Sequence, residues 1–218
     1  MTKSHPNGVD VQQEETAMNR ITKLTMVSGI LVGILGTGAA MAATALPPLP
    51  KMAQSSYWKD IGQRLTYIQE GHKGPVIYDF FDPNCPYCHG MYDEEQPLIK
   101  AGKLTVRYVP VAYLMPSSTP EAAALLQAPH RVFTLQHFEV LAAKSFAAPM
   151  GTHGPAGLPQ AKALPQTTHA LKVNMAVLQS AHSMGVPAIL YEHKNGSTGL
   201  IPGMVSHGEL LTMLPNLK

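Results

Sequence analysis

The sequence predicts an α/β fold in which a βαβ unit is followed, after a helical insertion, by a ββα unit. An apolar strand at residues 76–81, a helix that starts near Cys85 and an alternating strand at 104–111 indicate the βαβ unit. An Asn-Gly turn between two short apolar runs, followed by a helix start signal at Ser206, indicates the ββα unit. Of the 218 residues, 45% are hydrophobic and 14% are charged, and the net charge is +2. This composition is typical of a globular chain and indicates no nucleic-acid partner.

Residues 1–42 are predicted to be a signal peptide. A positively charged n-region precedes the uncharged apolar run 24–43, and a small-x-small tripeptide ends at Ala42, where cleavage is expected. Met18–Lys23 forms an n-region by itself, so our hypothesis is that Met18 is the true start. An uncleaved membrane anchor is the alternative, which the many Gly and Ala residues of the run disfavour. Export predicts a periplasmic location, which is an oxidising compartment.

Two short segments connect the signal peptide to the main domain. Residues 43–54 are predicted to be an extended, proline-rich linker. An amphipathic linker helix is predicted over 55–73, capped by Ser55 and Ser56 and ended by Gly71. We expect its apolar stripe to pack on the domain that follows, with partner binding as the alternative. The stripe consists of Trp58, Ile61, Leu65 and Ile68.

The only two cysteines of the chain, Cys85 and Cys88, lie at the start of the helix that follows the first strand. Cys85 fits the cap position and Pro86 the first helical position. The i, i+3 spacing places both side chains on one face, within reach of a disulfide. Free N–H groups and the helix dipole stabilise a thiolate at Cys85. The motif in this context predicts a redox dithiol.

Other uses of the two cysteines are weaker alternatives. A structural disulfide with this spacing closes a very short loop and constrains the unfolded chain little. Zinc needs four ligands and no second Cys pair exists, whereas copper bound by the two cysteines, His89 and Met91 is conceivable. Cys-x-x-Cys-His also matches the haem-attachment pattern, but haem does not require the buried strand and its acid upstream. We therefore expect no cofactor and no metal site.

The rest of the chain completes the topology. A mostly helical insertion is predicted over about 117–184, with helices starting at Thr119, at Val132 and at His169, and a Pro/Gly-rich loop over 147–166. A strand opened by Pro187, the hairpin turn 194–197, a second strand and a last helix over 207–214 follow. This order is thioredoxin topology, which we assign to residues 74–218.

Over about residues 74–218 the chain resembles the catalytic domain of the periplasmic thiol:disulfide interchange proteins, the DsbG/DsbC group. The resemblance rests on F-x-D-P-x-C-P-Y-C at residues 80–88, on the helical insertion and on Val186-Pro187 at a strand start. It implies that Cys85 attacks, that Cys88 resolves and that Pro187 is a cis-proline. It also implies an exported thiol-disulfide oxidoreductase or isomerase. Such a protein acts on cysteine-containing exported proteins, and a membrane redox partner resets it.

Two features depart from that group. Its members usually carry Thr before the cis-proline, whereas Val186 here is more like the oxidase DsbA. Its members also have an N-terminal dimerisation domain before a linker helix, and only the linker-like helix is present here. A monomer is therefore favoured.

Further site residues follow from their positions. We expect Cys85 to be exposed and Cys88 shielded, and an extended substrate to add beside Pro187, Val186, Pro86 and Tyr87. His89 and Asp82 are expected to modulate the thiolate. Asp79, inside the apolar strand, is the predicted proton acceptor for Cys88; an ordinary polar strand residue is the alternative.

A second function stays open. The chain could be a binding module, chaperone-like or copper-handling, that uses the same fold without turnover.

Overall fold

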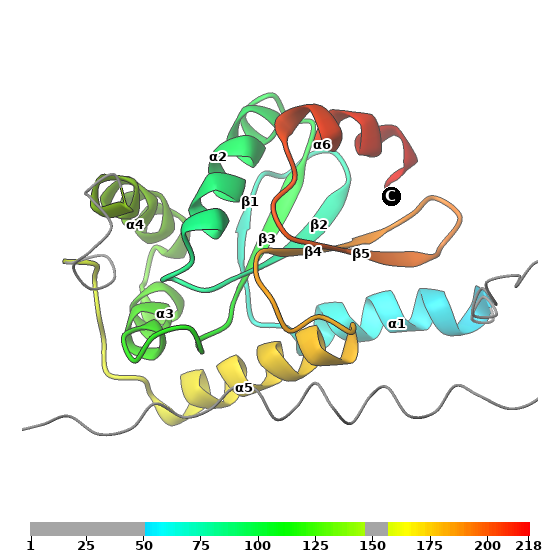
Figure 1. Cartoon of the computed structure of the whole chain (residues 1–218). Helices are drawn as coiled ribbons and strands as arrows, with labels where there is room; N and C mark the ends of the chain where they lie inside the picture. Colours follow the sequence, from blue (N-terminus) through cyan, green and yellow to red (C-terminus); the bar gives the residue numbers. More distant parts are fainter. Residues whose placement is uncertain (1–50, 147–156) are drawn as a thin grey trace, which may run out of the picture. The chain divides into compact units, whose positions relative to one another are not determined.

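A computed structural model describes residues 51–146 and 157–218, which belong to one unit of the chain, residues 47–218. Its centre is a five-stranded sheet with the order β1-β3-β2-β4-β5 (Figure 1). Strands β2 and β3 are parallel, and the other neighbouring pairs are antiparallel. The predicted thioredoxin topology is thus confirmed. The strands are β1 (Ile68–Glu70), β2 (Val76–Phe81), β3 (Thr105–Pro110), β4 (Ala188–Glu192) and β5 (Thr198–Pro202).

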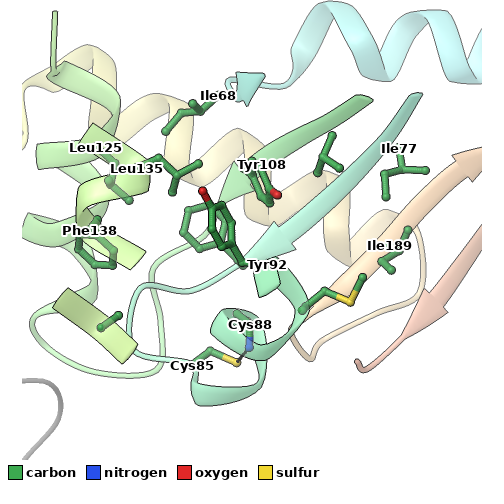
Figure 2. Close-up of a cluster of buried hydrophobic side chains, with 14 of the residues drawn as sticks. Ile68, Ile77, Cys85, Cys88, Tyr92, Tyr108, Leu125, Leu135, Phe138 and Ile189 are labelled. Atoms are coloured by element: carbon green, nitrogen blue, oxygen red, sulfur yellow. Dashed lines mark hydrogen bonds between the residues drawn. The ribbon is translucent and has the colours of Figure 1, made fainter. Parts of the chain in front are cut away.

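Helices cover both faces of the sheet because the central strand alternates between two hydrophobic clusters. Ile77 and Phe81 of β2 pack in a cluster with α2, α3, α4 and α6, and Figure 2 shows part of it. Tyr78 and Phe80 pack in the other cluster, with α1 and α5. The helices are α1 (Lys51–Arg64), α2 (Pro86–Lys100), α3 (Ser118–Gln127), α4 (Arg131–Phe146), α5 (Pro165–Ser180) and α6 (His207–Met213), followed by the 3-10 turn η1 (Leu214–Asn216).

The predicted extent of the linker helix, 55–73, is wrong at both ends. Helix α1 already includes Lys51 and ends at Arg64, and Ile68–Glu70 form an edge strand paired with β3. Pairing with a distant strand thus overrides the helical spacing of Ile68, whose side chain is buried in the strand. Gly71, with φ of 82°, turns the chain between β1 and β2 instead of capping a helix.

The apolar stripe of α1 packs on its own domain, as expected. Ile61 and Leu65 are buried in the cluster that contains Tyr78, and the Trp58 ring lies edge-on to the Tyr78 ring at 5.0 Å.

The insertion contains the three expected helices, but the third starts earlier than predicted. Pro165 and Gln166, assigned to a loop from the sequence, form the first turn of α5, which ends at Ser180. Pro165 fits there because the first helical residue needs no N–H partner.

The signals at the end of the chain are confirmed. The Val186–Pro187 bond is cis. Asn195 accepts a hydrogen bond from the Ser197 N–H at 2.9 Å in the hairpin turn. Ser206 and Glu209 form a complete capping box at the start of α6.

Several sequence predictions fall on residues outside the described part. These are the signal peptide 1–42 with the start at Met18, the linker up to residue 50, and residues 147–156 of the loop. Among the described helices, none has the length and apolar character needed to cross a membrane.

Candidate active site

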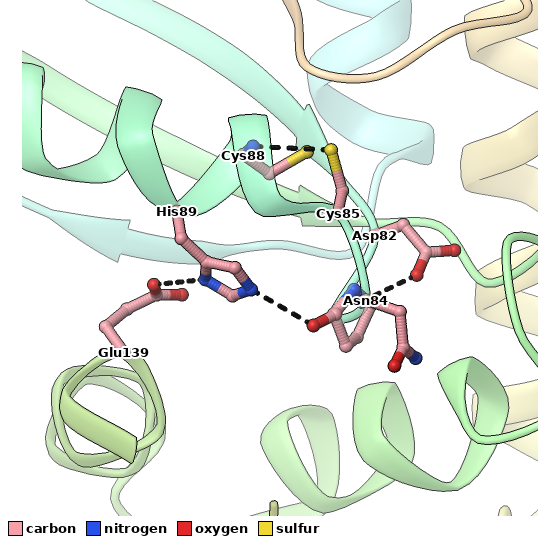
Figure 3. A network of polar contacts seen from close by, with 7 residues as sticks. Asp82, Asn84, Cys85, Cys88, His89 and Glu139 are labelled. Carbon is pink, nitrogen blue, oxygen red and sulfur yellow. Dashed lines mark hydrogen bonds and ion pairs between the residues drawn. The ribbon is translucent and has the colours of Figure 1, made fainter. Parts of the chain in front are cut away.

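Cys85 is the last residue of the turn between β2 and α2, directly before the helix. Its N–H donates to the Asp82 carbonyl at 2.9 Å, and Pro86 takes the first helical position, as predicted. The Cys85 sulfur accepts a hydrogen bond from the Cys88 N–H, with 3.3 Å between the two atoms (Figure 3). Both cysteines are free thiols. The sulfur therefore meets the unpaired N–H groups of the helix start.

The two thiols differ strongly in acidity. A hydrogen bond from the Cys88 thiol, the amide N–H groups of Cys88 and Tyr87 and the charge of His89 lower the pKa of Cys85 to about 7, although burial opposes this. Burial, followed by the hydrogen bond and charge of Cys85 and the charge of Asp79, raises the pKa of Cys88 well above its ordinary value. Near neutral pH Cys85 is thus about half thiolate, whereas Cys88 keeps its proton.

The expected difference in exposure is wrong. Cys85 and Cys88 are each only 3% exposed. The Val186 carbonyl, next to the cis-proline, lies 3.6 Å from the Cys85 sulfur. Acidity, not exposure, distinguishes the two cysteines.

Asp82 organises the turn that presents Cys85, and its modulation of the thiolate stays a prediction. Its buried carboxylate accepts hydrogen bonds from the N–H groups of Asn84 at 2.9 Å, Tyr113 at 2.8 Å and Leu114 at 3.0 Å. The Ser118 hydroxyl donates a fourth at 2.7 Å. A carboxylate with four donors is satisfied, so it fixes the residues that present Cys85.

Asn84 fastens the same turn to the helical insertion. Its side-chain amide donates to the Ser117 and Ser118 hydroxyls at 3.0 Å each and to Glu121 at 2.6 Å. The insertion, far away in sequence, therefore helps to hold the cysteine turn in place.

His89 lies on the first turns of α2 and pairs with Glu139 of α4. Its Nδ1 is 2.5 Å from the Glu139 carboxylate and its Nε2 is 3.1 Å from the Pro83 carbonyl (Figure 3). A carbonyl can only accept, so Nε2 carries a proton, and an ionised Glu139 makes the ring cationic. Burial lowers the pKa of His89, but the hydrogen bond and charge of Glu139 outweigh it and the pKa is raised. This supports the predicted modulating role of His89.

The residues predicted to bind substrate surround the Cys85 sulfur. Val186 is half-buried and turns its carbonyl to the sulfur, while Pro187 is buried behind it. Pro86 and Tyr87 are exposed, Tyr87 by 69%, which is unusual for an aromatic side chain. Their binding role stays a prediction.

Asp79 is not an ordinary polar strand residue. It is 1% exposed, and its Oδ1 has no hydrogen-bond partner. Burial, and then the charges of Cys85 and Glu139, raise the pKa of Asp79 well above its ordinary value. A buried acid with an unused oxygen near a thiol is a candidate for proton transfer.

The sequence interpretation missed two acids of the site, Glu95 and Glu139. Glu95 of α2 is completely buried, and Glu139 is almost as deep. The signal was present in their spacing: Glu95 shares the buried helix face of Met91 and Leu98, and Glu139 that of Leu135. An acid on the apolar stripe of a helix needs a reason to be there.

Metal binding was one alternative use of the two cysteines. Within the described residues, no group of three or more His, Cys, Asp or Glu side chains is arranged to hold a metal ion.

Comparisons with known proteins point to one family. The family model of the thioredoxin-like domain matches residues 62–218. The chain is 28% identical over 154 residues to the thiol:disulfide interchange protein DsbG of Pseudomonas aeruginosa, covering 68% of this chain and 56% of that protein. It is 32% identical over 88 residues to the Escherichia coli protein of the same name, covering 40% of this chain and 36% of that protein. The chain thus spans about half, or less, of the length of these relatives.

Solved structures support the same fold at lower identity. The catalytic domain of Proteus mirabilis ScsC matches with a TM-score of 0.57 and 16% identity, covering 76% of this chain and 96% of that one. A periplasmic thioredoxin-like protein from Salmonella enterica matches with a TM-score of 0.53 and 18% identity, covering 78% of this chain and 97% of that one.

Proposed function

The chain belongs to the thioredoxin-like domain family, and we propose that it is a thiol-disulfide oxidoreductase that exchanges disulfides with protein substrates. The observation that carries this proposal is the opposite shift of the two thiols. The pKa of Cys85 is lowered to about 7, so about half of it is thiolate at neutral pH, while Cys88 keeps its proton. The thiolate is the nucleophile in disulfide exchange.

The reaction proceeds in two steps. The Cys85 thiolate attacks one sulfur of a substrate disulfide, a Cys85–substrate disulfide forms, and the other substrate sulfur leaves as a thiolate. Cys88 then gives its proton to Asp79 and attacks the Cys85 sulfur. The Cys85–Cys88 disulfide forms, and the substrate sulfur leaves with the electron pair of the broken bond. The reverse sequence oxidises a substrate dithiol.

The surroundings of Cys85 suggest how the substrate binds. Tyr87 and Pro86 offer exposed apolar surface beside the sulfur, and the segment of Val186 and Pro187 lies on its other side. We propose that an extended substrate segment, which carries the reacting cysteine, lies between these residues and alongside the segment before β4.

Location and partners follow from the proposed chemistry. An oxidising compartment suits a dithiol exchanger, and one of the similar structures comes from a protein described as periplasmic. We propose that the signal peptide 1–42 directs export, that the substrates are cysteine-containing exported proteins, and that a membrane redox partner resets the dithiol.

Reduction of insulin disulfides by the reduced protein tests the activity. We expect turnover by the wild-type chain and none by Cys85→Ser, and accumulation of covalent mixed disulfides by Cys88→Ala. Tight substrate binding without Cys85-dependent turnover would refute the proposal in favour of the binding module. Equal trapping by both cysteine variants would refute the assignment of attacking and resolving thiols.

The direction of electron flow needs a separate measurement. The reduction potential against glutathione tests it, because a lowered pKa of Cys85 stabilises the reduced form and makes the disulfide more oxidising.

A further inference from the structure

Two buried carboxyl groups lie on the dithiol side of the sheet, and they come from different elements. Asp79 belongs to β2 and Glu95 to α2, and they are 1% and 0% exposed. Asp79 Oδ1 and both carboxylate oxygens of Glu95 have no hydrogen-bond partner. In residues 51–146 and 157–218, neither acid forms a salt bridge. Structural acids at such depth are paired or hydrogen-bonded, so this arrangement needs a different explanation.

The two carboxyls belong to elements that pack against each other, and the charge of Asp79 acts on both Glu95 and Cys88. In β2, Asp79 alternates with Tyr78 and Phe80 and so faces the same side as Ile77 and Phe81, against which α2 packs. Burial, and next to it the charge of Asp79, raises the pKa of Glu95. The charge of Asp79 also contributes to the raised pKa of Cys88. Cys88, Asp79 and Glu95 thus form a chain of interacting groups that leads from the helix start into the core.

Glu95 is separated from a surface groove by Glu70 and two glutamines. Glu70 of β1 is close enough to raise the pKa of Glu95, and its two oxygens accept hydrogen bonds from Gln96 at 2.8 Å and Gln136 at 2.7 Å. Both glutamines line a groove of about 750 Å³ between α2 and α4. None of the residues around the Cys85 sulfur lines this groove, so a substrate bound at the sulfur leaves it open.

We propose that Glu95 is the second acid of the exchange reaction, which takes from Asp79 the proton that Cys88 releases and passes it through Glu70 to the groove between α2 and α4. The inference deepens the proposed function and rests on it. The S–H bond of Cys88 breaks and an O–H bond forms on Asp79. The O–H bond on Asp79 then breaks as a carboxylate oxygen of Glu95 takes up the proton. Glu95 passes it to Glu70, and water in the groove takes it from Glu70. The site regains a proton-accepting Asp79 while the substrate still covers Cys85.

The groups that face Glu95 determine its pH dependence. No cation is among them: three acids disfavour a negative charge on Glu95, and the Tyr108 hydroxyl favours that charge in part. The Tyr108 hydroxyl is near but has no hydrogen-bond partner itself. These groups are Asp79 on β2, Tyr108 on β3, Glu70 on β1 and Glu139 on α4.

Release of a chromophoric aromatic thiol from a mixed disulfide made at Cys85 tests the relay, because release requires only Cys88. In Glu95→Gln we expect release at neutral pH to slow about tenfold, below the full effect of a lost general base. We also expect the pH of half-maximal release to fall by about one unit, because Asp79 loses the charge of Glu95 while that of Glu139 remains. Glu94→Gln, the same substitution one residue earlier on a half-exposed position, should change neither value.

Glu95→Met fills the same space without a polar group. It serves as the second variant if Glu95→Gln does not fold. The relay would be overturned if thiol release slowed by the same factor at every pH and the half-maximal pH moved in neither Glu95→Gln nor Glu95→Met. An equal shift in Glu94→Gln would overturn it too. Absence of insulin reduction by the wild-type chain refutes the proposed function alone, since thiol release is intramolecular and still tests Glu95.

Discussion

Asparagine in place of Asp79 removes a negative charge from a site that is only 1% exposed and keeps the shape of the side chain. Its effect on stability has a definite sign. The pKa of Asp79 in the folded protein is raised above the ordinary value of 3.8, so the folded state binds the proton more tightly than the unfolded state. Stability from this group is complete below the unfolded pKa and is lost as the pH rises through the folded pKa.

The size of the gain follows from the same shift. Each unit by which the pKa is raised costs the wild-type protein about 1.4 kcal/mol once the acid is ionised. We expect Asp79→Asn to stabilise the reduced protein by about 1–3 kcal/mol at mildly alkaline pH, the usual range for an unsatisfied buried polar group. The gain should vanish in acid. Urea unfolding of the reduced proteins over a pH series measures it.

Asp82→Asn is the matched control, because both acids are buried near the same cysteine. Asp82 accepts four hydrogen bonds, and its amide would turn an N–H group towards some of these donors. We therefore expect Asp82→Asn to destabilise the protein by about 1–3 kcal/mol. Opposite signs for the two substitutions distinguish a functional acid from a structural one.

The same Asp79→Asn variant should resolve mixed disulfides slowly. Loss of the proton acceptor of Cys88 should slow resolution about 100-fold and leave the attack by Cys85 nearly unchanged. Stopped-flow measurement separates the two steps. Equal slowing of both steps, together with no gain in stability at any pH, would refute the reasoning and return Asp79 to a packing role.

Three further predictions follow from the site and the leader. His89→Gln should raise the pKa of Cys85 above about 7, because the cation that lowers it is lost; thiolate absorbance against pH measures this, and an unmoved titration would contradict the role of His89. Tyr87→Ser should raise the KM for a protein substrate about tenfold, the effect of losing a moderate contact, with unchanged exchange with glutathione disulfide as its control. Intact mass of the exported protein should show a chain that begins at Ala43; recovery of uncleaved chain with the membrane would show an anchor instead.

Much of the site could be predicted because its signals are local in the chain. Pro86 after Cys85 marks the helix start that lowers the pKa of the thiol, and both features depend on a few consecutive residues. Asn195-Gly196 and the Ser206–Glu209 capping box are equally local, and all were found from the sequence. Asp79 could be singled out because an acid inside an apolar strand is costly wherever the strand lies.

The tertiary structure alone decided what depends on distant pairing. Ile68–Glu70 became a strand because β3 offers free hydrogen-bonding groups to it, which the helical spacing of the apolar residues could not reveal. His89 meets Glu139 across 50 residues, and the cation that this pair creates depends on how α4 packs against α2.

The near-equal burial of Cys85 and Cys88 was decided in the same way. The Val186 carbonyl, 101 residues after Cys85, lies 3.6 Å from its sulfur, a contact that the helix start alone could not predict. The sequence by itself therefore determined which atoms we propose to react, because their chemistry comes from neighbours in the chain. The fold decided their burial, their charge partners and the route of the proton, because these come from residues that meet only when the chain is packed.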